Sequence, residues 1–290
     1  TRQPGGPMAH KNAPPRIEIK DLTFAYASTS CSSNVNATLM PRNVLNGVNV
    51  NVKAGGYSLG VVGPSGCGKS TLLRVVLGLE SIDTSTSSAQ ILIDGVDVTN
   101  LDRIHCFSMI GQDSDLFRGL NVEENVKYGV FENVGNAEEI KVALKNAAED
   151  SQLFPVIDSL KGGWKAAVGP RGRLLSGGER QRVCLARALY REEMGSSILL
   201  MDEATSNLDA VTENLVTKAI MKRVQLGATA IIVAHRLSSV QNCDMILVLG
   251  EGGNVVERGT HEELIASNGW YAKSWRLQSD DRDLGIPGKF

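Results

Sequence analysis

The sequence predicts an α/β fold with a parallel-sheet core, an antiparallel β layer before it and a helical subdomain inserted within it. Short continuous apolar segments separated by helical stretches are typical of a parallel sheet covered on both faces. These segments lie at 58–62, 198–201, 231–234 and 245–249. Segments 17–26 and 44–52 instead alternate apolar and polar residues, which predicts antiparallel strands with one solvated face. Residues 121–160 are mostly helical in composition.

These elements predict one domain between two tails. Residues 1–15 carry four prolines and no periodic pattern, which indicates a linker or tail. The domain is expected to span 16–278, with the helical subdomain at about 113–188. The acidic end at 279–290 is expected to be a loose C-terminal tail.

Composition excludes some functional classes. The 290 residues hold 30 Lys and Arg against 32 Asp and Glu, for a net charge of -2. This balance argues against binding nucleic acid through overall basicity. The longest apolar stretches are far shorter than the roughly 20 residues of a membrane span. Five widely spaced cysteines fit free thiols in a reducing compartment better than disulfides or a zinc site.

A phosphate-binding loop carries the first chemical signal. Residues 63–70 fit the pattern G-x-x-x-x-G-K-[ST] between a predicted strand and helix, which is the context of a P-loop NTPase. Glycines let backbone N–H groups surround phosphate oxygens, and the helix start adds a positive dipole end. Lys69 is expected to reach the β- and γ-phosphates, and Ser70 to ligate Mg²⁺. The nucleotide-binding residues of the loop are Gly63, Ser65, Gly66, Cys67, Gly68, Lys69, Ser70 and Thr71, with the Cys67 side chain incidental to the motif.

An acidic pair is the expected partner of this loop. Asp202 and Glu203 end the apolar strand that begins at residue 198. Asp202 is placed to hold Mg²⁺ directly or through water. Glu203 is placed to orient or deprotonate the attacking water. Alone, such a pair would more often be a solvated loop start; beside the phosphate loop, the catalytic interpretation is favoured.

A second glycine-rich helix start follows at Ser176–Glu179. Ser176 is a plausible N-cap, and Gly177 and Gly178 leave N–H groups open at the helix start. The plain interpretation is an ordinary capped helix. A protein that hydrolyses one nucleotide has no obvious need for two phosphate cradles.

Residues 17–278 resemble the nucleotide-binding domain of an ATP-binding cassette (ABC) transporter, with a RecA-like P-loop core. The segment LSGGE, Leu175–Glu179, matches the signature motif of that family. Tyr26 matches the aromatic that stacks on adenine, and Gln112 matches the Q-loop glutamine that contacts Mg²⁺ and senses the transmembrane domain. The segment 206–209, ending in Asp209, matches the D-loop. His235 matches the switch histidine that contacts the γ-phosphate.

The resemblance implies an ATPase that binds ATP and Mg²⁺ and dimerises head to tail. Lys69, Gln112, Glu203 and His235 would be catalytic, with metal contacts from Ser70, Gln112 and Asp202. The nucleotide would also contact Tyr26 and Asp209, and in trans Ser176, Gly177, Gly178 and Glu179.

It also implies partners and a location. The partners would be a second nucleotide-binding domain, identical or different, and the transmembrane domains of the same transporter, without nucleic acid. Those membrane domains are expected to lie outside these 290 residues. They would hold this domain on the cytosolic or mitochondrial-matrix side.

Details of the motifs resemble export-type subfamily B members, and the ending at 270–278 resembles the half-transporters of the mitochondrial and heavy-metal group. Two positions depart from the pattern: Pro170 replaces a glutamate implicated in contact with the transmembrane domain, and Gly111 stands where a proline is frequent. The Ser/Thr-rich segments 27–42 and 81–89 are expected to be surface insertions.

Three alternatives stay open. A soluble ABC ATPase not coupled to transport usually carries a coiled-coil insertion or two cassettes, and the sequence has neither. A non-hydrolysing, ATP-gated interaction module would bind ATP without Mg²⁺-dependent phosphate release. A P-loop kinase would have no use for LSGGE.

Overall fold

The computed structural model describes residues 15–26, 43–82, 88–101, 106–130, 135–205 and 207–283, with side chains to Ser279. The predicted N-terminal tail, apart from Pro15, lies outside these ranges. So do the segment 27–42, residues 83–87 of the second insertion, and Ser206.

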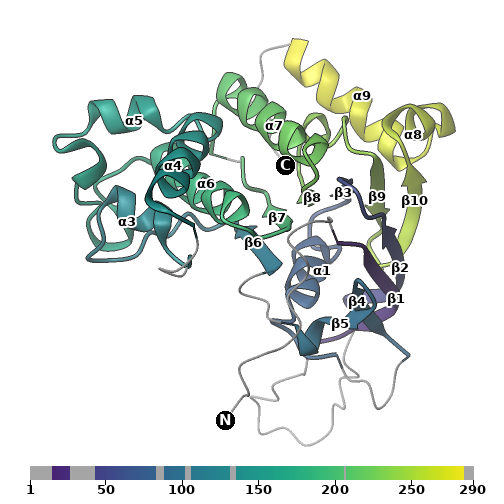
Figure 1. The fold of residues 1–290 in the computed structure, drawn as a ribbon. Coiled ribbons are helices and arrows are strands. Elements are labelled where there is room, and N and C mark those ends of the chain that lie inside the picture. Colours follow the sequence, from purple (N-terminus) through teal and green to yellow (C-terminus); the bar gives the residue numbers. More distant parts are fainter. Residues whose placement is uncertain are drawn as a thin grey trace, which may run out of the picture.

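The larger sheet carries the predicted parallel core (Figure 1). In the described ranges its strand order is β10-β9-β3-β8-β7-β6, and only β10 pairs antiparallel to its neighbour. The strands are β3 (Ser58–Val62), β6 (Phe107–Ile110), β7 (Ile198–Asp202), β8 (Thr229–Val233), β9 (Met245–Leu249) and β10 (Val255–Gly259). The four predicted apolar segments are therefore β3, β7, β8 and β9. The edge strands β6 and β10 were not predicted, since β6 is short and β10 alternates.

A smaller antiparallel sheet forms the predicted β layer. Its order among the described strands is β2-β1-β4-β5. The strands are β1 (Ile17–Phe24), β2 (Leu45–Val52), β4 (Gln90–Ile93) and β5 (Val96–Asp97). In β2, Val48 and Val50 are buried while Asn49 and Asn51 are exposed, as the alternation predicts.

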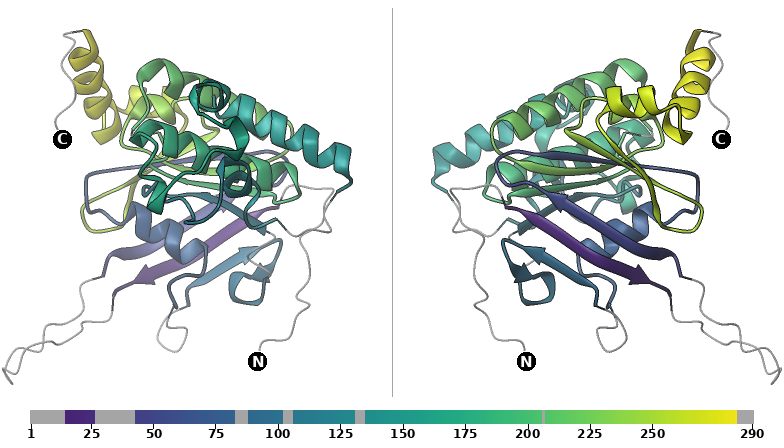
Figure 2. Two further views of the ribbon diagram at one scale, coloured as in Figure 1. Left: turned by 90° about the vertical axis from the view of Figure 1, so that its left-hand side faces the viewer. Right: turned by 90° about the vertical axis from the view of Figure 1, so that its right-hand side faces the viewer.

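The larger sheet is covered on both faces, which explains its continuous apolar strands. Leu199 and Met201 of β7 pack into the helix-covered core, while Ile198 and Leu200 pack into the core between the two sheets. Helix α1 (Lys69–Val76) belongs to the core between the sheets. Figure 2 shows the remaining helices gathered above the larger sheet, with β1 and β2 below it.

The helical subdomain begins after β6. It contains α3 (Val122–Lys127), α4 (Ala137–Asp150), α5 (Phe154–Ser159) and α6 (Gly177–Glu193), with single 3₁₀ turns η2 (Gly163–Lys165) and η3 (Pro170–Gly172). Helices α3 and α4 pack on α6. The smaller sheet carries η1 (Val98–Asn100), and α7 (Ala210–Gln225), η4 (Leu237–Ser239), α8 (His261–Ser267) and α9 (Trp270–Asp283) complete the described chain.

Several helix ends differ from the sequence expectation. Helix α1 ends at Val76, where Gly78 adopts a positive φ of 63° and closes a Schellman turn. Helix α6 continues five residues past the expected boundary at 188. Helix α9 continues to Asp283, so the expected boundary at 278 falls within a helix. None of the helices in the described ranges is both long and apolar enough to cross a membrane.

Candidate active site

The predicted site residues gather at the carboxyl ends of three adjacent strands. The phosphate loop follows β3, Asp202 ends β7, and His235 lies two residues after β8. Strand β8 pairs with both β3 and β7 in parallel, so all three strands end at the same edge of the sheet. This edge is where open α/β sheets place their ligand sites.

The phosphate loop needs glycine at its two ends. Gly63 has a φ of 150°, and a Cβ there would lie 2.2 Å from the carbonyl oxygen of Leu249. Gly68 adopts a left-handed φ of 101° as the N-cap of α1, and a Cβ would lie 2.8 Å from the carbonyl oxygen of Val44. Crowding from β2 and β9 therefore determines the path of this loop as much as its own sequence does.

The Cys67 side chain turns into the protein, away from the outer face of the loop. It is 2% exposed, and its Sγ would lie 2.9 Å from a Cβ built on Gly63. Burial raises the pKa of the thiol, with a smaller opposing effect of Lys69. The side chain is thus a packing group.

Lys69 is held over the loop. Its side chain is buried, and Nζ donates hydrogen bonds of 2.9 Å to the carbonyl oxygens of both Gly63 and Pro64. Within the described part of the chain, α1 starts without a side-chain cap and without an acidic residue in its first turn. The start of α1 therefore offers N–H groups and one ammonium group, with no acidic residue in its own first turn, which suits a phosphate.

Ser70 and Asp202 form a second contact between the loop and β7. Ser70 Oγ donates to Asp202 Oδ1 at 2.9 Å, and Asp202 is buried. Burial raises the pKa of the Asp202 carboxyl, while the Ser70 hydrogen bond and the charge of Lys69 oppose the rise. A hydroxyl and a carboxylate side by side fit Mg²⁺, which takes one or two carboxylates and completes its shell with water and phosphate oxygens. Across the described ranges, no group of three or more His, Cys, Asp and Glu forms a complete metal cage.

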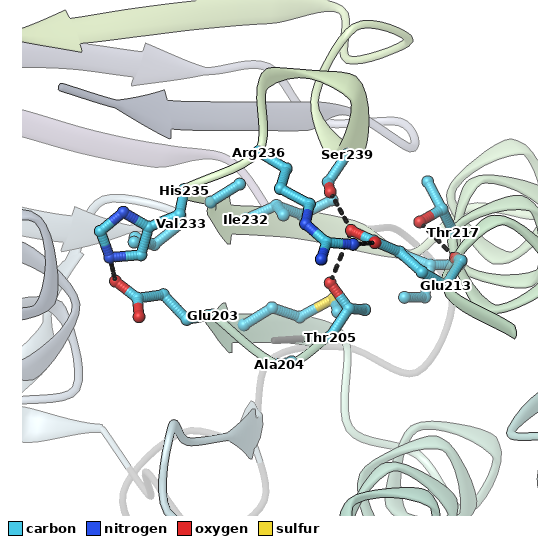
Figure 3. A pocket seen from close by; sticks show the side chains of 13 residues that line it. Glu203, Ala204, Thr205, Glu213, Thr217, Ile232, Val233, His235, Arg236 and Ser239 are labelled. Atoms are coloured by element: carbon cyan, nitrogen blue, oxygen red, sulfur yellow. Dashed lines mark hydrogen bonds and ion pairs between the residues drawn. The ribbon is translucent and has the colours of Figure 1, made fainter. Parts of the chain in front are cut away.

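Glu203 and His235 meet at the edge of the site, as Figure 3 shows. His235 Nε2 lies 2.6 Å from Glu203 Oε1. The Glu203 side chain is 9% exposed and the His235 side chain 52%, so a shielded carboxylate meets an accessible imidazole. Glu203 has a φ of 51°, unusual for a side-chain-bearing residue, while its N–H donates to the carbonyl oxygen of Val233. Such backbone strain is a feature of functional positions.

Tyr26 lies beside the phosphate loop, whereas Gln112 makes no hydrogen bond with the loop among the described residues. The Tyr26 hydroxyl lies 3.3 Å from Thr71 Oγ1, and the ring is 44% exposed and packs edge-on against Phe24. Gln112 follows β6 and is exposed, and no hydrogen bond within the described ranges joins its side chain to Ser70 or Asp202. Tyr26 thus lies at the loop, while the Gln112 side chain is exposed to solvent at the end of β6, the strand next to β7.

The signature segment lies against the D-loop. Ser176 caps α6 in a capping box: Glu179 N donates to Ser176 Oγ at 3.3 Å, and Ser176 N donates to Glu179 Oε2 at 2.6 Å. A Cβ on Gly178 would lie 3.2 Å from the carbonyl oxygen of Asn207. Among the described residues no hydrogen bond or ion pair joins this segment to the phosphate loop.

Asp209 caps the next helix. Its carboxylate accepts hydrogen bonds from the backbone N–H and the hydroxyl of Thr212, which hold its pKa below the ordinary value. It also lies 3.8 Å from the Arg182 guanidinium of α6. The carboxylate is thus occupied in tying α7 to α6, and it does not join the phosphate-loop group.

Sequence reasoning missed a cluster around Glu213 of α7. The Glu213 carboxylate accepts hydrogen bonds from Thr205 Oγ1 at 3.1 Å and Ser239 Oγ at 2.7 Å, and it pairs with the Arg236 guanidinium. These groups line a cavity of about 200 Å³ that reaches Glu203 and His235 (Figure 3). A buried glutamate thus links the chain after Glu203 to the chain after His235. The only sequence signal was an acidic residue on a helix face that should be apolar.

Comparison with known proteins decides the family. A family model described as ABC transporter matches residues 45–206, more than half of the chain. The chain belongs to the ABC transporter family. It is an ABC nucleotide-binding domain, the ATPase unit of that family, with the expected P-loop NTPase fold.

The similar proteins are ABC exporters and multidrug transporters. The chain is 35% identical over 280 residues to ABC multidrug transporter MDR5 of Trichophyton rubrum, covering 96% of this chain and 20% of that protein. It is 37% identical over 282 residues to human ATP-binding cassette sub-family B member 6, covering 96% of this chain and 30% of that protein. A solved bacterial Atm1-family ABC exporter with ATP bound matches with a TM-score of 0.79 and 32% identity, over 96% of this chain and 44% of that chain. This ABC domain therefore spans 20% of the length of the fungal relative and 30% of the length of the human one. The expected likeness to subfamily B exporters is confirmed.

Proposed function

We propose that this chain binds Mg²⁺-ATP at the phosphate loop and hydrolyses it to drive substrate export by a membrane transporter. The observation that carries the proposal is the Glu203–His235 contact of 2.6 Å at the sheet edge that carries the phosphate loop. A carboxylate and an imidazole beside a phosphate cradle provide a base and a group for the γ-phosphate at one site. The bound ATP of the similar Atm1-family exporter supports ATP as the ligand.

The phosphate loop supplies most of the binding. Lys69 Nζ, held by two carbonyl oxygens of the loop, would bind phosphate oxygens of the nucleotide there. The open N–H groups at the start of α1 would receive the other oxygens. Tyr26 presents an accessible ring beside Thr71, where it would stack on adenine.

Ser70 and Asp202 would hold Mg²⁺, with Gln112 as a further ligand after it turns toward them. When bound, the ion neutralises developing charge on the β- and γ-phosphates. The 2.9 Å hydrogen bond between Ser70 and Asp202 keeps the two oxygens close together before the nucleotide arrives. The ionised form of Asp202, which burial disfavours, would become the stable form beside a cation.

Hydrolysis needs one proton acceptor. The Glu203 carboxylate would accept a proton from the attacking water while the water oxygen bonds to the γ-phosphorus. The bond from that phosphorus to the bridging oxygen breaks, which leaves ADP and phosphate. The His235 imidazole would stabilise the γ-phosphate oxygens, while its contact with Glu203 keeps both side chains at the same edge.

We further propose that the signature segment acts on the nucleotide of a second copy or a homologous domain. Gly177 and Gly178 are partly accessible at the start of α6, and no interaction ties them to this chain's own phosphate loop in the described ranges. A head-to-tail pair would give each nucleotide both helix starts, with two-fold symmetry if the domains are identical. Ser176, Glu179 and Asp209 would border that second nucleotide.

Coupling to membrane domains, and a place on the cytosolic or matrix side, are part of the same proposal. Most of each similar transporter lies outside the region matched here, so there is room for membrane domains in a longer protein. The domain limits of 16–278 and the mitochondrial or heavy-metal subgroup stay predictions. A soluble ABC ATPase without a membrane partner would share all of the chemistry above but no coupling.

The test measures phosphate release from ATP with and without Mg²⁺, and the size of the protein with ATP. We expect release that requires Mg²⁺, and a nucleotide-dependent dimer in size-exclusion chromatography. ATP binding without Mg²⁺-dependent release would indicate the non-hydrolysing module and overturn the enzymatic proposal. Joined to its membrane domains in liposomes, the protein should show transport that stops when Glu203 is changed to Gln. Unchanged transport would overturn the coupling.

A further inference from the structure

The last described helix makes direct contact with the loop of the switch histidine. Gln278 of α9 accepts a hydrogen bond from Leu237 N at 2.9 Å through its Oε1. Its Nε2 donates to the carbonyl oxygen of His235 at 3.0 Å. One side-chain amide therefore uses both of its polar ends on the backbone on either side of Arg236.

This contact supplies a cap that the loop does not make itself. Leu237 is the first residue of the 3₁₀ turn η4, and its N-cap residue, Arg236, makes no side-chain cap among the described residues. The start of such a turn leaves N–H groups without an internal partner. Gln278 fills this place from a position 41 residues further along the chain.

Helix α9 is anchored firmly enough to hold Gln278 in place. The Glu257 carboxylate accepts hydrogen bonds from the N–H groups of Trp270 and Tyr271 at the helix start. Tyr271 is fully buried, and its hydroxyl lies 2.9 Å from His261 Nδ1. Tyr271 and Gln278 are seven residues apart, so two helical turns bring them to the same face. The packing that anchors Tyr271 thereby directs Gln278 toward the site.

The loop after β8 is thus held from two sides. Glu213 of α7 binds the side chains of Arg236 and Ser239, while Gln278 binds the backbone of His235 and Leu237. The contacts of Glu213 are made with the side chains at 236 and 239. The amide of Gln278 acts on the backbone itself.

We propose that Gln278 is a positioning residue for hydrolysis: α9 sets the place of the His235 imidazole through the amide of Gln278. The proposal rests on the proposed ATPase function, because it assigns a partner to the switch histidine. It makes the C-terminal helix part of the active-site support. Any displacement of α9 would then reduce the rate of hydrolysis without touching the nucleotide.

The test replaces Gln278 with Met, which keeps the length of the side chain and helix propensity but removes both hydrogen bonds. We expect kcat to fall about 10-fold with KM for ATP nearly unchanged, because the phosphate loop is untouched. The melting temperature should fall by only about 2–4 °C, the cost of roughly 1 kcal/mol of lost hydrogen bonding. The matched control is Lys273→Met, the same replacement at an exposed position of the same helix, with wild-type kcat expected. A second control combines Gln278→Met with His235→Ala, in which we expect no loss beyond that of His235→Ala alone.

Hydrogen exchange provides a readout that does not depend on activity. The peptide covering 235–240 should exchange about 10-fold faster in Gln278→Met than in wild type or Lys273→Met. Unchanged exchange, a wild-type kcat in Gln278→Met, or additive losses with His235→Ala would each overturn the positioning role. An inactive wild-type protein would overturn the proposed function instead. Faster exchange in that case would still support the contact between α9 and the loop.

Discussion

The two glycine-rich helix starts of this domain look alike in sequence and differ in structure. Helix α1 starts at Gly68 with left-handed backbone and no side-chain cap, and it carries the buried Lys69. Helix α6 starts at Ser176 with a complete capping box, and it carries the acidic Glu179 in its first turn. The start of α1 thus has no side-chain cap on its N–H groups and carries the Lys69 ammonium group. The start of α6 has two N–H groups bound in its capping box and carries the Glu179 carboxylate.

This difference indicates unequal roles for two anion cradles. A site with open N–H groups and an ammonium group can bind phosphate alone. A capped start with an adjacent carboxylate is a weaker anion site, since the capping box satisfies two N–H groups and the charge opposes another anion. We therefore expect α1 to bind ATP in the monomer, and α6 to contribute only when a partner domain brings a nucleotide to it.

The largest expected effect tests whether the two helix starts meet on one nucleotide. Glu203→Gln removes the proton acceptor, so kcat for ATP hydrolysis should fall by about 10³-fold while ATP binding persists. The γ-phosphate then stays in place, and a stable ATP-bound dimer should appear in size-exclusion chromatography. Wild-type turnover in this variant would exclude Glu203 as the base. If the variant hydrolyses ATP slowly but stays monomeric with ATP, the proposal that α1 and α6 of two domains bind one nucleotide is contradicted.

Lys69→Ala tests the first cradle alone. Loss of the ammonium group should weaken ATP binding to the monomer by at least about 100-fold, because charge-assisted contacts to phosphate are the strong ones. Titration with a fluorescent ATP analogue measures the change. Unchanged affinity would contradict the assignment of the phosphate loop.

Ser176 tests the second cradle with a matched pair. Ser176→Ala should reduce stability by about 1 kcal/mol through loss of the cap. Ser176→Asp keeps the cap, because Asp is a good N-cap residue, and adds a negative charge. Both variants should bind ATP as monomers like wild type.

The added charge of Ser176→Asp should affect formation of the dimer. In the Glu203→Gln background, Ser176→Asp should weaken the ATP-dependent dimer by about 10-fold or more, through repulsion of the partner's nucleotide. Sedimentation against protein concentration measures this. If the dimer of Ser176→Asp equals that of the parent, α6 is a capped helix and nothing more.

The smallest effect concerns Asp202 and pH. Burial raises the pKa of this carboxyl above its ordinary value of 3.8. As pH rises from 3.8 through that raised pKa, ionisation of the buried carboxyl lowers the stability of the nucleotide-free protein. Asp202→Asn removes this cost and should raise the melting temperature by about 2–4 °C at pH 7 without nucleotide. The gain should shrink as pH falls toward 3.8 and be absent below it, because the carboxyl is then protonated in both the folded and the unfolded chain.

With Mg²⁺-ATP present, wild type should be more stable than Asp202→Asn, because only wild type gains the contact between this carboxylate and the metal. A variant stabilised equally by Mg²⁺-ATP would contradict the metal assignment.

Local motifs allowed much of the site to be predicted. The loop around Lys69, the acid pair after β7 and His235 each sit at the end of a predictable apolar strand, and strand order then brings them together. The Ser176 cap was likewise readable, because capping depends on residues three positions apart. Gln112 was predicted as a ligand, but its exposed side chain needs a rearrangement that a sequence motif does not describe.

Contacts between distant segments were beyond the sequence. Glu213 reads as one more acid on a helix, and its role emerges when α7 packs beside the loops after β7 and β8. Gln278 stood at the edge of an expected loose tail, and the continuation of α9 to Asp283 places it inside a helix.

The sequence by itself determined the family, the fold class and the chemistry of the phosphate loop. Each depends on short segments in which glycines, a lysine, carboxylates and apolar runs have one local consequence. Only the tertiary structure decided which donors stay open, that Cys67 turns inward and that Gln278 holds the backbone beside His235. The physical reason is that these features depend on which atoms of distant strands and helices occupy the same space, and local propensity carries no information about that.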